Sequence, residues 1–124
     1  MPQAMATEIQ KQCETIEECY EFTLSFAARG LASDEGSELR GQLTRAVAAM
    51  RGLQQSCAEA IEQEQLAPAK KYEAFYAVLK RDAESALAAI ELVLAQPTIG
   101  SQLIDNLNAS IHLRALLADL FLIT

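Results

Sequence analysis

Apolar side chains recur every three or four residues along four long segments of the chain, and this is the period of an amphipathic α-helix. The rule is followed most strictly in the second segment, where spacings of four and three alternate as in helices that pack side by side. Its apolar positions are Leu39, Leu43, Ala46, Met50, Leu53, Cys57 and Ala60. The pattern predicts helices at about residues 5–29, 34–66, 68–96 and 98–123.

Residues that commonly begin or end helices lie at the breaks between these segments. Thr7, with a glutamine three residues later, fits a capping box, and Ser33 and Thr98 are candidate N-caps. Pro68 suits a first helical position, and Gly30 can close the first helix in the left-handed conformation. Because the connections are short, each helix is expected to run antiparallel to the one before it. We therefore predict a single all-α domain over residues 1–124, an antiparallel up-down-up-down four-helix bundle.

The last segment carries two apolar stripes, although a simple bundle helix needs only one. The stripe predicted to face the core consists of Leu103, Ile104, Leu107, Ile111, Ala115, Ala118 and Leu122. A second stripe lies roughly opposite, at Leu113, Leu116, Leu117, Leu120 and Ile123. Left in water, it would form an apolar patch on the order of a few hundred Å², a size typical of interfaces. We interpret it as the interface of a homodimer or of a protein partner. The alternatives are that this helix is more central in the fold, or that the loop around Pro68 packs on the end of the chain.

A polar edge on the same segment is the only arrangement that resembles a site: Ser101, Asp105, Asn108 and His112. An aspartate one or two turns from a histidine can orient an imidazole that titrates near neutral pH. However, there is no second histidine, and no cysteine or serine fits a nucleophile motif. We assign no catalytic residue, and we interpret Asp105, Asn108 and His112 as hydrogen-bonded residues at the edge of an interface.

Charge and composition narrow the possible partners. Ten basic against seventeen acidic residues give a formal net charge of -7, which disfavours binding to a phosphate backbone. No apolar run approaches the ~20 residues of a membrane span, and the first residues lack the basic and apolar regions of a leader peptide. We therefore expect no nucleic acid, no membrane insertion and a cytoplasmic location.

Metal, cofactor and disulfide chemistry find little support in the sequence. The cysteines Cys13, Cys19 and Cys57 are odd in number and form no CxxC pair, which indicates buried free thiols. The Glu-x-x-His motif of carboxylate-bridged metal sites is missing, since Ala109 stands three residues before His112. There is no glycine-rich phosphate loop either. We expect neither a bound metal nor a cofactor.

These observations favour a non-enzymatic helical protein that acts through protein–protein interaction, as an adaptor, a regulator or a chaperone. In size, acidity and antiparallel helices the chain is similar to small helical export chaperones, a likeness of architecture that no motif supports. The competing hypothesis is a small-molecule-binding module or an enzyme with a pocket around His112 and Asp105.

Overall fold

The computed structural model describes residues 3–63 and 69–124, and this part of the chain consists of helices and loops without any strand. The three long helices are α1 (Gln3–Ala28), α2 (Leu39–Gln63) and α3 (Ala69–Leu94). Two short helices follow them, α4 (Ser101–Ala109) and α5 (His112–Phe121). The all-α prediction is confirmed. Among the described helices, none is both long enough and apolar enough to cross a membrane.

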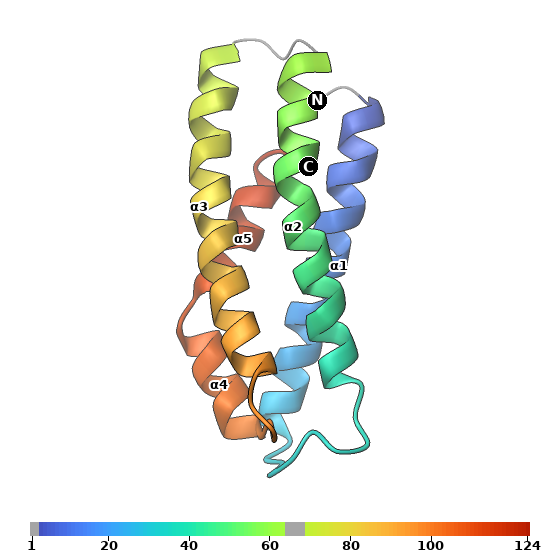
Figure 1. Ribbon diagram of the computed structural model, residues 1–124, viewed down its shortest axis with the longest axis vertical. Coiled ribbons are helices and arrows are strands. Elements are labelled where there is room, and N and C mark those ends of the chain that lie inside the picture. The colour runs from blue at the N-terminus through green and yellow to red at the C-terminus, as the bar shows by residue number, and fades with distance from the viewer. Residues whose placement is uncertain (1–2, 64–68) are drawn as a thin grey trace.

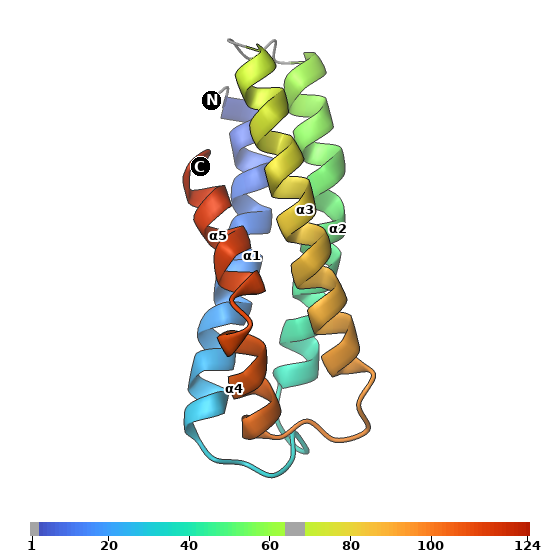
Figure 2. The same cartoon turned by 90° about the vertical axis from the view of Figure 1, so that its left-hand side faces the viewer.

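The long helices lie side by side, and α4 and α5 follow one another along the remaining side (Figures 1 and 2). Consecutive long helices run in opposite directions, and the N- and C-terminal ends of the chain lie toward the same end of the molecule. Helix α1 packs against α2, α4 and α5. Helix α3 packs against the same three helices. The apolar core therefore lies between the α1–α2 pair and the α3, α4 and α5 helices.

The seven apolar positions that alternate along the second segment are all buried in this core, each with at most 5% of its surface exposed. They meet a matching stripe of α1 that includes Ile9, Ile16 and Phe26. Burying a large aliphatic or aromatic side chain stabilises the fold by roughly 1.5–3 kcal/mol. The helical period thus correctly identified the buried face of α2.

The first connection differs from the prediction in detail. Gly30 has a φ of 63° and ends α1 in the left-handed conformation, as expected. Helix α2 begins at Leu39 and not at residue 34, because Gly36, with a φ of 78°, belongs to a turn that a helix cannot contain. The Ser37 hydroxyl accepts the first helical amide, that of Leu39, at 3.1 Å. At the other end, α1 already begins at Gln3, so Thr7 lies inside the helix and not at its N-terminus.

The predicted helix over residues 98–123 is broken in two. Its first part begins after Gly100, which replaces Thr98 as the N-cap residue, and ends at Ala109. Ile111 then adopts the left-handed conformation with a φ of 62°. A new helix starts directly after it, turned relative to the old one. The predicted boundary between residues 66 and 68, including Pro68, lies outside the described residues.

This break overturns the assignment of the two apolar stripes. The stripe predicted as an interface is the core face of α5: Leu113, Leu116, Leu117 and Leu120 are at most 3% exposed, and Ile123 is half-buried against the core. Three positions predicted to be in the core are instead exposed, namely Ile111, Ala118 and Leu122. A residue in the left-handed conformation redirects the chain, so the period before the break does not continue after it. The interface predicted at these leucines is therefore corrected.

Candidate functional site

The polar edge predicted on the last segment does not assemble into a site. Ser101 is buried at the start of α4, where its hydroxyl donates to the carbonyl of Phe26 at 2.6 Å and accepts the amide of Leu31 at 2.8 Å. Asn108 is half-buried, and its Oδ1 lies 3.2 Å from the Thr23 hydroxyl of α1. Both side chains therefore fasten α4 to α1.

Asp105 and His112 are both exposed, and neither side chain makes a hydrogen bond or an ion pair with another described residue. His112 is the first residue of α5, so the break at Ile111 separates it from the face of α4 that carries Asp105. The hypothesis of a pocket around these two side chains is thus not supported by the geometry.

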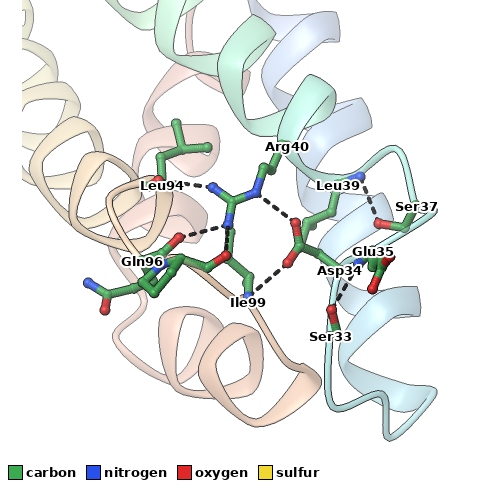
Figure 3. A network of polar contacts seen from close by, with 10 residues as sticks. Ser33, Asp34, Glu35, Ser37, Leu39, Arg40, Leu94, Gln96 and Ile99 are labelled. Atoms are coloured by element: carbon green, nitrogen blue, oxygen red, sulfur yellow. Dashed lines mark hydrogen bonds and ion pairs between the residues drawn. The ribbon is translucent and has the colours of Figure 1, made fainter.

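A second polar network lies where the loop between α1 and α2 meets the loop between α3 and α4 (Figure 3). The Arg40 guanidinium of α2 contacts Asp34 at 2.7 Å and donates to the carbonyls of Leu94 and Gln96 at 3.0 and 2.7 Å. The other oxygen of Asp34 accepts the Ile99 amide at 2.8 Å. This amide, more than the guanidinium, holds the pKa of Asp34 below its ordinary value. The network joins the loop after α1 to the loop before α4, which is a structural function.

Two carboxyl groups meet where α5 packs on α3. Burial raises the pKa of Asp119 to about 7, and the carboxyl group of the neighbouring Asp82 adds to the effect. Near neutral pH Asp119 is therefore only partly ionised, and the loss of its proton places a second negative charge beside Asp82, between α3 and α5.

An open groove of about 460 Å³ runs between α1 and α5. Its walls are Glu17, Tyr20, Glu21 and Leu24 from α1 and Arg114, Leu117, Ala118 and Phe121 from α5. Leu24 and Phe121 are 46% and 54% exposed, so two large apolar side chains border the groove at the surface. We call this feature the α1–α5 groove.

A second groove, of about 390 Å³, separates α2 from α3. The residues that α2 contributes are Leu53, Gln54, Cys57 and Ala58, and those from α3 are Glu73, Tyr76, Ala77, Leu79, Lys80 and Ala83. Alanine occupies positions on both walls, and these short side chains leave room between the two helices. We call this feature the α2–α3 groove.

The cysteines offer no activated nucleophile. All three are buried and free, as predicted. Burial is the main cause that raises the pKa of Cys13, and it raises the pKa values of Cys19 and Cys57 to about 12. At neutral pH these side chains are therefore neutral thiols, whereas nucleophilic cysteine chemistry requires the thiolate.

Neither groove was predicted from the sequence. A groove depends on which helices become neighbours and on how far apart small residues hold them, and the period of one helix contains neither fact. Searches of protein family models, curated proteins and solved structures found no match to this chain. Function must therefore be argued from the grooves themselves.

Proposed function

We propose that this chain is a partner-binding module built as an antiparallel four-helix bundle with a divided last helix. In this proposal it acts through protein–protein contact at the α1–α5 groove, and its partner is a basic amphipathic helix. The observation that carries the proposal is an apolar groove bordered by exposed Leu24 and Phe121 and by the acidic side of α1.

A partner in the α1–α5 groove would cover large apolar side chains that are now exposed. Exposed aliphatic residues are common on protein surfaces, but an exposed aromatic ring beside a groove is typical of residues that dominate binding energies. Phe121 and Leu24 border the same groove from opposite walls, with the ring of Tyr20 beside them. A helix whose apolar side chains repeat every three to four residues can enter such a groove along its length.

The charged residues around the groove favour a positively charged partner. Glu14, Glu17, Glu18 and Glu21 lie along α1, and two of them line the groove. Arg114 is the only basic residue among the groove's lining residues. The acidic side of α1, together with the formal net charge of -7, favours a basic partner and accelerates its approach at low salt.

A second copy of the chain suits this groove less well than a basic helix. In a twofold dimer the same surface meets itself, so the glutamates of one α1 would approach those of the other. The homodimer predicted from the sequence rested on the leucines of α5, which the fold uses for its own core. We therefore assign the groove to a different protein.

The proposal can be tested with a fluorescently labelled model peptide of leucine and lysine, about 18 residues or five helical turns long. Fluorescence anisotropy measures its binding to the wild-type chain and to Phe121→Ala. Leu92→Ala serves as a matched control, because Leu92 is 67% exposed on α3 and does not line the groove. We expect Phe121→Ala to weaken binding about tenfold or more and Leu92→Ala to leave it unchanged.

Charge variants and light scattering complete the test. Glu17→Gln combined with Glu21→Gln should weaken binding and make it less sensitive to salt. A peptide of the same composition without helical period should bind weakly. Equal binding to wild type and Phe121→Ala, or a wild-type dimer that Phe121→Ala converts to monomer, would overturn the proposal of a basic partner helix.

A further inference from the structure

We propose that Arg114 determines which charge pattern a partner of the α1–α5 groove must have. In this proposal the partner helix carries an acidic side chain that pairs with Arg114 at one end of the groove and a basic side chain that pairs with Glu17 at the other. The pairing rests on the proposed function, because it is made by the same partner. It specifies where on an otherwise basic helix an acidic residue is favourable.

Helices α1 and α5 line the groove in opposite directions, since α1 begins toward the end of the molecule where α5 finishes (Figures 1 and 2). At the end of α4, just before the break, the Thr23 hydroxyl of α1 donates to Asn108 Oδ1 at 3.2 Å. Helix α5 then runs from this level toward the beginning of α1. Arg114, in the first turn of α5, therefore lies toward Leu24, whereas the last turn of α5 lies toward Glu17.

The charges that line the groove are consequently separated along it. Arg114 lies at one end and Glu17 at the other, with Glu21 one helical turn from Glu17. The α1 wall extends from residue 17 to residue 24, which corresponds to about 10 Å or two turns of helix. None of the three charged side chains forms an ion pair with another described residue. A partner helix in the groove therefore meets opposite charges at its two ends.

Charges at fixed positions determine the register of a partner more than its overall affinity. An acidic side chain of the partner is attracted by Arg114 and repelled by Glu17 and Glu21, so only one end of the groove accepts it. A helix that carries lysine at every polar position would instead place a like charge beside Arg114. Because Arg114 and Glu21 are exposed, water screens these pairs, and each should change the affinity by about two- to fivefold.

The test compares the leucine and lysine peptide with a second peptide in which glutamates replace the lysines of the first turn. Fluorescence anisotropy gives the ratio of their two dissociation constants for each variant of the chain. Relative to wild type, Arg114→Gln should shift this ratio about two- to fivefold in favour of the lysine peptide, and Arg114→Glu should shift it further. Arg81→Gln removes the same charge at an exposed position of α3 outside the groove, and it should keep the wild-type ratio.

The direction of the bound peptide provides a second readout. A nitroxide at the N-terminus of the glutamate peptide should broaden the amide NMR signals of Arg114 and Leu24 more than those of Glu17 and Phe121. Moving the glutamates to the last turn should reverse this order. An unchanged ratio in Arg114→Gln, or one direction for both peptides, would overturn the role of Arg114 and leave the partner-helix proposal intact. A lysine peptide that does not bind wild type, or that binds Phe121→Ala equally well, would overturn both.

Discussion

Replacing Asp119 with asparagine should raise the free energy of unfolding at alkaline pH, and this gain should become smaller as the pH falls. In the folded chain, burial and the neighbouring Asp82 raise the pKa of Asp119 from 3.8 to about 7. The folded state therefore binds its proton more tightly than the unfolded state does. The stability of the wild type must fall as the pH rises from about 4 through about 7, and the penalty is complete above that range. Asparagine has nearly the same shape and does not ionise.

The magnitude follows from the change in pKa. At about 1.4 kcal/mol per pH unit, a rise from 3.8 to about 7 corresponds to at most about 4 kcal/mol. Asp119 is only half-buried, so water screens part of the charge, and we expect a gain of about 1–2 kcal/mol for Asp119→Asn at pH 8.5. Roughly half of this gain should remain at pH 5.5, where the unfolded carboxyl is ionised and the folded one is protonated.

Urea unfolding at pH 5.5 and 8.5 measures both quantities. Asp82→Asn should give a smaller gain than Asp119→Asn, because it removes only the neighbouring charge and leaves the carboxyl of Asp119 buried, so Asp119→Asn should still stabilise the Asp82→Asn chain at pH 8.5. Asp105→Asn is the control, since Asp105 is exposed on α4 and should change stability by less than about 0.5 kcal/mol at either pH. A gain for Asp119→Asn that does not depend on pH would refute the raised pKa of Asp119.

Three further predictions concern the last two helices and the loops. Leu116→Ala should lower the free energy of unfolding by about 2–5 kcal/mol in urea titrations because Leu116 is fully buried, whereas Leu122→Ala, at a position that is 75% exposed, should change it little. Ile111→Gly should raise the melting temperature by relieving a left-handed conformation that costs an ordinary residue about 1–2 kcal/mol, although the greater freedom of unfolded glycine offsets part of this gain. Asp34→Ala should cost about 1–3 kcal/mol in thermal unfolding, since both the Ile99 amide and the Arg40 guanidinium lose their acceptor.

The parts of the fold that the sequence predicted are those determined by a single helix and its ends. In α2, Leu43 and Met50 follow a strict period, so the buried face could be identified without knowing what covers it. Gly30 was identified as a left-handed cap because glycine alone adopts that conformation without a steric cost.

The candidate sites could not be predicted because they depend on pairs of helices. Nothing in the sequence around Ala58 or Ala77 indicates a site. The two residues line a groove only because α2 and α3 lie side by side at these positions. The same holds for Asp82 and Asp119, which belong to different helices far apart in sequence. Spacing within one segment suggested a site at Asp105 and His112, and the fold separates those residues.

The sequence pattern does not reveal the break at Ile111, because isoleucine rarely adopts the left-handed conformation. The break is explained by the apolar side chains that it buries. A continuous helix would bury Ile111 and Leu122 and leave four leucines in water, whereas the broken chain buries the four leucines and exposes those two residues. The broken chain therefore buries two more large side chains than a continuous helix would. At roughly 1.5–3 kcal/mol for each of them, burial favours the break by about 3–6 kcal/mol. A β-branched residue in the left-handed conformation costs about 1–2 kcal/mol. The gain in burial exceeds the local strain, so the second apolar stripe is explained by the packing of α5 against α1 and α3 without any interface.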